Sequence, residues 1–304
     1  MSDLINYKIK NYEENDVVKE LEIYNKIMKN FDPEAHKYTV ENMDYRYKSK
    51  TFDPEQVKFL VDTKTGEIIG YSAVDLTETE AHIEYPFILD EHRTEELMDY
   101  LFKEALSYAK SKRDLIISDP YKQSITSIVE FFKKYDATPH EMYKNYKIDV
   151  EKLNYDISPV KAYEVTVDSL EKLNDFIKNA KKPSGGVIEK EYFENQFKEG
   201  NFSPERFKYI EKDGTILGAV AASLQRSDNE NEPPTSSLNF YLMDLDHPNA
   251  NDFRRASVGS LYQGLKNEGV KEFTVGIGEE SPAKPIFKEI GFKEFDEAFT
   301  RYKF

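Results

Sequence analysis

One short group of residues stands out as a candidate for chemistry on a negatively charged ligand. Only eight of the 42 basic residues are arginine, yet two of them are adjacent. The pair lies near the start of an amphipathic helix expected over about residues 252–268. A helix start offers free N–H groups and a favourable dipole, and a guanidinium adds a charge, so an anion is the suited ligand. On this ground the candidate binding residues are Arg254 and Arg255.

A second group consists of two carboxylates near the end of an expected strand. Asp244 and Asp246 alternate with Leu245 in the sequence Leu-Met-Asp-Leu-Asp-His. A positioned carboxylate can act as a general base by accepting a proton from a reacting group. Acidic residues at strand ends are more often solvated, and this simpler interpretation stays open.

The composition excludes several classes of site. The chain has no cysteine, which removes disulfides, thiolate metal sites and cysteine nucleophiles. None of its five histidines are four residues apart, so a zinc-protease helix is excluded and no metal is expected. The formal charge of -15 argues against a nucleic-acid partner. We expect a cytoplasmic protein without a membrane partner, because no apolar run is long enough to span a bilayer and the N-terminus lacks a signal pattern.

The same arrangement of elements occurs twice in the sequence. Gly66 and Gly70 belong to one expected β-hairpin, and Gly214 and Gly218 recur in a second hairpin 148 residues later. A period this long fits two copies of one domain rather than a solenoid. We therefore expect two domains, residues 1–152 and residues 160–304.

Hydrophobic patterns indicate an α/β domain with a mixed sheet. Alternating or continuous apolar runs predict strands, and a spacing of three to four residues predicts helices. An N-terminal strand and a helical stretch come first, and a final alternating strand closes each half, at 142–148 and at 299–304. In the first half the intervening order is three strands, a long helix, a buried strand and a short helix, expected at 55–61, 67–76, 81–89, 94–112, 115–117 and 125–135.

This order of elements resembles the GNAT acetyltransferase superfamily, and two segments carry the resemblance. Arg93, within residues 90–105, sits where the superfamily's R-x-x-G-x-G/A motif begins. Residues 279–292, with Phe287 and Gly291, look like its N-x-x-A…Y-x-x-x-G-F ending. The resemblance implies an α/β fold of two tandem GNAT-like domains, each a mixed, mostly antiparallel sheet flanked by helices. It also implies transfer of an acetyl or other acyl group from coenzyme A to an amine, with acetyl-CoA as co-substrate.

The coenzyme loop is degenerate in the first domain. In the superfamily this loop opens the long helix and cradles the pyrophosphate, and its glycines let the backbone approach the phosphate oxygens. The two glycine positions are Glu96 and Met98 here. A carboxylate would repel the pyrophosphate and the methionine would fill its space. We expect no coenzyme in this domain, with Arg93 and Glu96 as solvated charges.

The second domain is the candidate acyl-CoA-binding domain, and two alignments of its loop stay open. Read locally, Arg254 begins the motif, and Ser257 and Gly259 take the glycine positions. Aligned with the internal repeat, Asn251 begins the motif, and Arg254 and Ala256 take those positions. The resemblance thus implies five candidate coenzyme-binding residues, Arg254, Arg255, Ala256, Ser257 and Gly259. The alternative is an amphipathic helix with solvated arginines.

The catalytic set of the superfamily is incomplete. Its usual proton donor to the departing thiolate is a tyrosine on the last short helix, and the equivalent positions are Phe132 and Phe287. A base from the central strand would be Asp244 or Asp246 in the second domain, or Glu84 in the first.

Three functions remain open. The first is an acyl-CoA-dependent N-acyltransferase whose second domain is the active half, with a small-molecule or peptide amine as acceptor. The second is a non-catalytic protein that binds another ligand or partner. The third is aminoacyl or acyl transfer to a peptide-like substrate.

Overall fold

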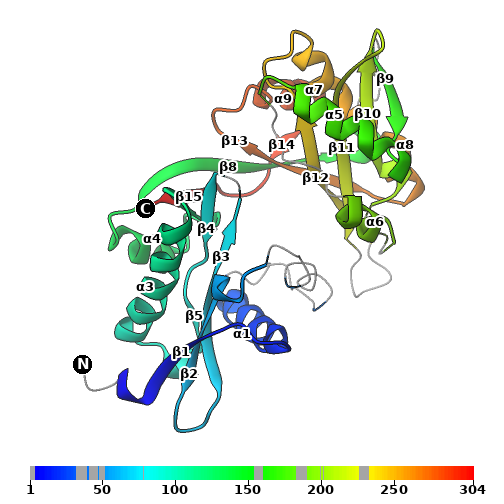
Figure 1. The fold of residues 1–304 in the computed structure, drawn as a ribbon. Coiled ribbons are helices and arrows are strands. Elements are labelled where there is room, and N and C mark those ends of the chain that lie inside the picture. The colour runs from blue at the N-terminus through cyan, green and yellow to red at the C-terminus, as the bar shows by residue number, and fades with distance from the viewer. Residues whose placement is uncertain are drawn as a thin grey trace. The chain divides into compact units, whose positions relative to one another are not determined.

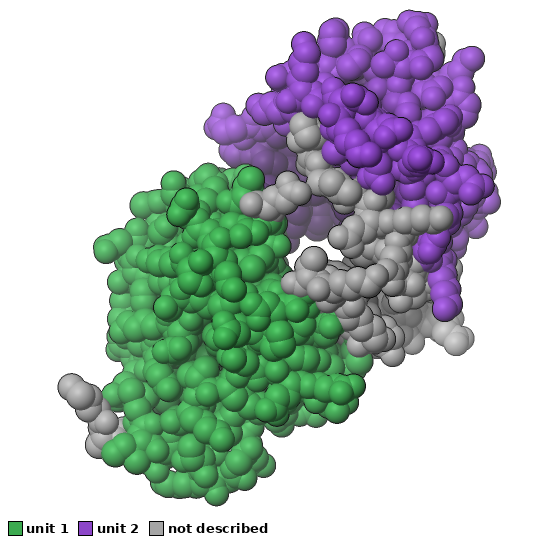
Figure 2. Space-filling model, in the orientation of Figure 1, with its two compact units in different colours: residues 1–142, 299–304 green, residues 143–298 purple. Residues whose placement is uncertain are grey.

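The computed structural model describes residues 4–31, 40, 47, 52–77, 79–153, 160–182, 190–198, 200, 202–225 and 233–304. The chain forms two compact units of helices and strands (Figure 1). Unit 1 contains residues 1–142 and 299–304, and unit 2 contains residues 143–298 (Figure 2). Within the described ranges, no helix combines the length and apolar character needed to cross a membrane.

Unit 1 is built on a mixed sheet with the strand order β1-β2-β3-β4-β6-β15. Among the pairs with a defined register only β4 and β6 run parallel, while β5 pairs with β3 and β7 with β15. The elements are η1 (Leu4–Asn6), β1 (Tyr7–Asn11), α1 (Asp16–Phe31), η2 (Pro54–Gln56), β2 (Val57–Asp62), β3 (Ile68–Leu76), β4 (Glu80–Ile83), β5 (Phe87–Ile88), η3 (Asp90–His92), α3 (Glu95–Lys112), β6 (Leu115–Ser118), β7 (Tyr121–Lys122), α4 (Thr126–Lys133), β8 (Thr138–Asp149) and β15 (Phe299–Lys303).

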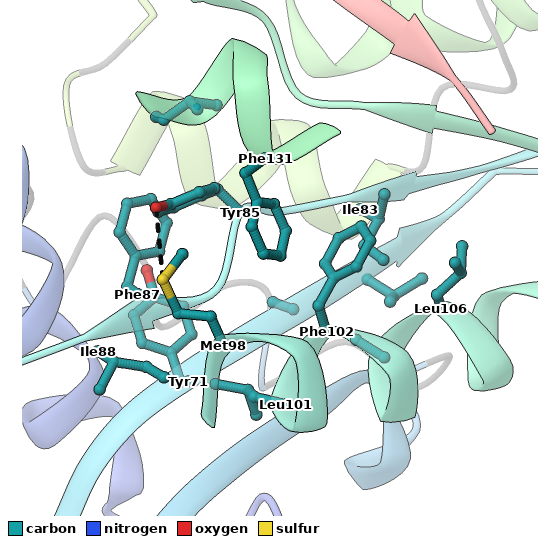
Figure 3. Close-up of a cluster of buried hydrophobic side chains, with 14 of the residues drawn as sticks. Tyr71, Ile83, Tyr85, Phe87, Ile88, Met98, Leu101, Phe102, Leu106 and Phe131 are labelled. Carbon is teal, nitrogen blue, oxygen red and sulfur yellow. Dashed lines mark hydrogen bonds between the residues drawn. The ribbon is translucent and has the colours of Figure 1, made fainter. Parts of the chain in front are cut away.

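Helices cover both faces of the unit 1 sheet. Every residue of β2 is buried, which requires that neither face of this strand is open to water. α1 and α3 lie on opposite sides of the strands (Figure 1). α1 buries Ile23 and Ile27, and α3 buries Leu101 and Phe102, in one hydrophobic core whose α3 side is drawn in Figure 3.

Unit 2 repeats this plan with the strand order β8-β13-β12-β11-β10-β9, in which only β12 and β13 pair in parallel. One hydrophobic cluster joins the sheet to α5 and α6, and another joins it to α7, α8 and α9. The elements are η4 (Val150–Lys152), β9 (Lys161–Glu164), η5 (Val167–Ser169), α5 (Leu170–Asn179), α6 (Lys190–Lys198), η6 (Pro204–Arg206), β10 (Phe207–Lys212), β11 (Thr215–Gln225), β12 (Thr235–Met243), α7 (Ala250–Gly259), α8 (Tyr262–Asn267), β13 (Glu272–Gly278), α9 (Lys284–Ile290) and β14 (Lys293–Glu294). The predicted α/β fold with mixed, mostly antiparallel sheets is confirmed.

The two predicted hairpins are present and match each other in detail. β2 pairs with β3, and β10 with β11. Gly66 and Gly214 in their turns have φ of 77° and 78°, a left-handed conformation that glycine adopts without steric cost. Each hairpin also shifts register once, next to Leu60 and next to Ile210.

The helix expected over 252–268 is two helices. α7 ends at Gly259 and α8 begins at Tyr262. At the break, the Ser260 hydroxyl donates to the Ser257 carbonyl (2.7 Å), and the Ser257 hydroxyl donates to the Arg254 carbonyl (2.9 Å). Such local bonds compete with helix propagation, and the adjacent glycine weakens the helix further.

The last strands of the two halves are exchanged between the units. β8 follows the elements of unit 1, but its residues Tyr143–Asp149 pair with β13 of unit 2. β15 follows the elements of unit 2, but it belongs to unit 1, where Tyr302 packs against Phe132 with ring centroids 5.6 Å apart. The compact units therefore do not coincide with the segments 1–152 and 160–304. An alternating pattern in the sequence indicates which face of a strand is buried. It does not indicate which sheet has a free edge with which that strand can pair.

Gly218 provides a test of the close packing between β11 and β12. A Cβ at this position would lie 2.2 Å from the Leu242 carbonyl oxygen and 2.7 Å from the Phe253 ring. Gly218→Ala should lower the free energy of unfolding by about 1–3 kcal/mol in urea denaturation, because the backbone must shift. Gly276→Ala is the control, since its Cβ would meet only the Asn145 side chain at 3.6 Å. Equal losses in the two variants would contradict this account.

Candidate functional site

The neighbouring parallel strands β12 and β13 of unit 2 diverge. They pair over only three positions, Thr235–Ser237 with Glu272–Thr274. Beyond these, β12 continues to Met243 against β11, and β13 continues to Gly278 against β8. The facing edges of the two strands therefore separate, and α7 begins shortly after the end of β12.

The N-cap residue of α7 does not cap the helix with its own side chain, although its N–H donates to Nδ1 of His247 (3.0 Å). Asn249 occupies the N-cap position, but its side chain makes no capping hydrogen bond. Its Oδ1 instead accepts from Lys212 Nζ (3.3 Å), which also forms an ion pair with Asp252 (2.7 Å). Asp252 is thus neutralised by a lysine rather than turned onto the helix amides. Because the Lys212–Asp252 pair carries no net charge, the positive end of the α7 dipole is not cancelled by this carboxylate, and such an end favours an anion.

Arg254 places a buried positive charge at the same terminus. Its side chain runs back toward the first turn, where Nη1 donates to Oδ1 of Asn251 (2.7 Å). Arg254 is only 5 % exposed, and among the described residues no carboxylate lies within ion-pair distance of its guanidinium. Charges of this kind are rarely buried without a counter-ion.

Tyr241 on β12 completes a polar cluster beneath α7. Its ring packs edge-on against Phe253 (5.2 Å between centroids), and its hydroxyl interacts with Ser257. Burial raises the pKa of Tyr241 strongly, while the nearby charge of Arg254 and the Ser257 hydroxyl oppose that shift. Tyr241 is not among the residues expected from the sequence, although its alternation with Met243 on a strand is a signal that it faces a helix.

The five expected coenzyme-binding residues do not all converge. Arg254 and Ser257 lie together under α7. Arg255 is exposed, 3.7 Å from Glu289, and Ala256 is buried in the hydrophobic cluster. Ala256 and Gly259 lie inside the helix rather than in a loop before it, so their main-chain N–H groups are not at the helix terminus.

The two expected bases have different surroundings. Asp244 directly follows β12, and its carboxylate accepts the backbone N–H groups of Lys181, Lys182 and Asp246, each at 3.1 Å. Although burial alone would raise the pKa of Asp244, these three bonds hold the pKa below its usual value. This arrangement favours a structural role, because a weakly basic carboxylate with both oxygens engaged is a poor proton acceptor. Asp246 is exposed.

The sequence matches no known family model and no curated protein. Solved structures match over nearly the whole chain. A tandem GNAT protein from the clavulanic acid biosynthesis pathway aligns with a TM-score of 0.63 at 11% identity, covering 98% of each chain. A GCN5-related N-acetyltransferase from Sphaerobacter thermophilus has a TM-score of 0.63 at 11% identity, covering 98% of this chain and 95% of that one.

A third structure is the Saccharomyces cerevisiae N-myristoyltransferase with bound myristoyl-CoA. It aligns with a TM-score of 0.64 at 12% identity, covering 98% of this chain and 82% of that one. The chain has a tandem GNAT fold. The resemblance inferred from the sequence is therefore confirmed at the level of fold.

The start of α3 in unit 1 differs from the start of α7 in unit 2, because hydrophobic and ion-paired side chains occupy it. Thr94 caps α3 by accepting the N–H of Leu97 (3.3 Å). Met98 is buried, and its sulfur lies 3.9 Å from the Tyr85 hydroxyl, a contact drawn in Figure 3. Arg93 is half-buried, ion-paired with Asp90 at 3.1 Å. The start of α3 therefore has a side-chain cap and a neutralised arginine.

The positions of the usual GNAT tyrosine are hydrophobic in both units. Phe132 and Phe287 are fully buried in the two cores. Glu84, the expected base of the first half, follows β4 and donates its N–H to the Ala73 carbonyl (2.9 Å). Across the described ranges, no group of histidines and acidic residues is arranged to hold a metal ion.

Asp244 yields a prediction that separates a structural from a catalytic role. Asp244→Asn should lower the free energy of unfolding at pH 7 by about 2 kcal/mol, because hydrogen bonds to a charged acceptor are lost. A carboxylate with a depressed pKa stabilises the fold above its unfolded pKa of about 3.9, and this stabilisation disappears as the pH falls through the folded pKa.

Urea denaturation at pH 7 and at about pH 2.5 measures this effect, with Asp246→Asn as the exposed control. The difference between wild type and Asp244→Asn should shrink at the lower pH, and the control should change by no more than about 0.5 kcal/mol. An unchanged stability of Asp244→Asn at pH 7 would contradict the structural role.

Proposed function

We propose that the chain is an acyl-CoA-dependent N-acyltransferase in which unit 2 binds the coenzyme. The observation that carries this proposal is the charge of Arg254, which is buried near a helix start whose N-cap side chain makes no capping bond, without a carboxylate partner among the described residues. A pyrophosphate would supply the missing counter-charge, accept charge-assisted hydrogen bonds from the guanidinium and lie at the positive end of the helix dipole.

The divergence of β12 from β13 suits the rest of such a coenzyme. The edge of β12 that faces β13 has no strand partner after Ser237 in the described ladder. An extended ligand that carries amide groups could bond to this edge in the way that a peptide adds to a sheet. The thioester carbonyl carbon would then be attacked by the acceptor amine, the C–S bond would break, and the thiolate would take up a proton.

The proposed acid–base groups differ from the usual GNAT set. Phe287 has no hydroxyl with which to protonate a thiolate. Asp246, exposed two residues beyond the Asp244 carboxylate, is the candidate proton acceptor for the amine. The N-myristoyltransferase binds myristoyl-CoA, so a longer acyl group is as compatible with the fold as acetyl. The acceptor would be a small-molecule or peptide amine.

The second candidate function is binding without catalysis. It is favoured by the phenylalanines at both tyrosine positions, Phe132 and Phe287, which are fully buried and chemically inert. In that case the same Arg254 site would hold an anionic ligand without turnover.

Arg254 and Arg93 provide matched tests, because the two arginines lie at or near the starts of corresponding helices, α7 and α3. Arg254→Ala should weaken acetyl-CoA binding by about 10- to 150-fold, which corresponds to a charge-assisted hydrogen bond of about 1.5–3 kcal/mol. Arg93→Ala should leave the affinity unchanged. Isothermal titration of the full chain with acetyl-CoA measures both, and thermal melting checks that each variant is folded.

Three results would count against the proposal. Equal affinity of Arg254→Ala and wild type would remove the coenzyme from this helix start. Absence of binding by acetyl-CoA and myristoyl-CoA in the wild type would leave only the non-catalytic function. Binding without acyl transfer to any amine tested would also favour that function.

A further inference from the structure

Unit 2 contains a second candidate site, in a cavity of about 810 Å³. Its described lining comes from the start of η5, the end of α6, η6 and the residues before it, the end of β11 and the residue after α8. This volume lies within the range of small-molecule sites, which is about 300–1,000 Å³. Its size alone makes it a candidate for a ligand other than the coenzyme.

The cavity is separate from the start of α7. Its lining residue Leu224 lies near one end of β11, whereas Gly218 lies six residues back and pairs with Met243 at the end of β12. Six residues of extended strand span about 20 Å. A ligand in the cavity would therefore not compete with an anion at Arg254.

One wall of the cavity is apolar. It is formed by the rings of Phe197 and Phe202 and by the side chain of Leu224. Phe202 lies in a ring cluster with Phe193 and Phe207, with centroids 5.8 and 5.4 Å away, so this wall is fixed by packing. Such a surface suits an aromatic or aliphatic body.

Two charged residues of opposite sign, Arg206 and Glu268, lie close together in the described lining of the cavity. Arg206 is 1 % exposed, and its guanidinium donates to the carbonyls of Ala222 (2.7 Å) and Gly200 (3.2 Å). Its Nε lies 3.9 Å from a carboxylate oxygen of Glu268. An anionic ligand would be repelled by Glu268, and a cationic ligand would be repelled by Arg206. These two side chains therefore favour neither sign of charge.

Ser203 supplies a polar group without a protein partner. It precedes η6 but makes no side-chain capping bond. Its Oγ is buried, and within the described part of the chain it has no hydrogen-bond partner. A buried hydroxyl without a partner is uncommon in native proteins, and a ligand group that both donates and accepts would satisfy it.

We propose that this cavity binds a neutral small molecule with an aromatic or aliphatic body and an amide or hydroxyl head group that hydrogen-bonds to Ser203. The apolar wall holds the body, the paired charges of Arg206 and Glu268 disfavour ionic head groups, and Ser203 orients the polar end.

Three probes of nearly equal size test the charge preference. Benzamide is neutral and its head group both donates and accepts, benzoate is an anion, and benzylamine is a cation at pH 7. Titration of the full chain, followed by NMR, should show the tightest binding for benzamide. Equal binding of the three probes would overturn the proposal. So would the absence of benzamide binding at ligand concentrations up to about 10 mM.

Two substitutions at one position test the hydroxyl. Ser203→Ala should weaken benzamide binding by about 2- to 12-fold, as expected for one neutral hydrogen bond. Ser203→Thr keeps the hydroxyl and should bind benzamide within about 2-fold of wild type. Both variants should melt near the wild-type temperature, because Ser203 makes no protein hydrogen bond through its side chain. Unchanged benzamide affinity in Ser203→Ala would overturn the assignment of the hydroxyl.

Discussion

The unequal pairing of β13 is the constraint on which the candidate anion site of unit 2 depends. One edge of β13 bonds to β8 along its full length, Glu272–Gly278 against Tyr143–Asp149. The other edge bonds to β12 over three residues only. Because β13 is held from the β8 side, β12 can leave it without loss of the sheet, and α7 starts where β12 ends. The position of Arg254 follows from that divergence.

Polar groups then distinguish two otherwise similar halves. At the start of α3, Thr94 provides the cap, Asp90 neutralises Arg93, and Met98 occupies the interior beside Tyr85. At the start of α7 the cap is absent and the guanidinium is buried without a carboxylate among the described residues. The same fold therefore presents a closed helix start in unit 1 and an electropositive one in unit 2.

Local features of this structure could be predicted from the sequence, and features set by distant contacts could not. The turns at Gly66 and Gly214, the long helix α3 and the mixed sheet follow from residue type and periodicity. The partners of β8 and β15 depend on which sheet edge is free, and no pattern within a strand records that. Likewise, the acidic character of Asp244 was readable, whereas the three N–H groups that engage its carboxylate come in part from Lys181 and Lys182, over 60 residues away.

The exchange of the last strands also has a consequence for the order in which the chain can fold. Unit 2 is one continuous stretch, residues 143–298, whereas unit 1 is completed only by residues 299–304. On the ribosome, all of unit 2 has therefore been synthesised before β15 exists to pair with β6 or to bring Tyr302 to Phe132. Domains usually fold in order from the N-terminus. Here the C-terminal unit can be finished first, and its N-terminal neighbour has to wait for the last strand.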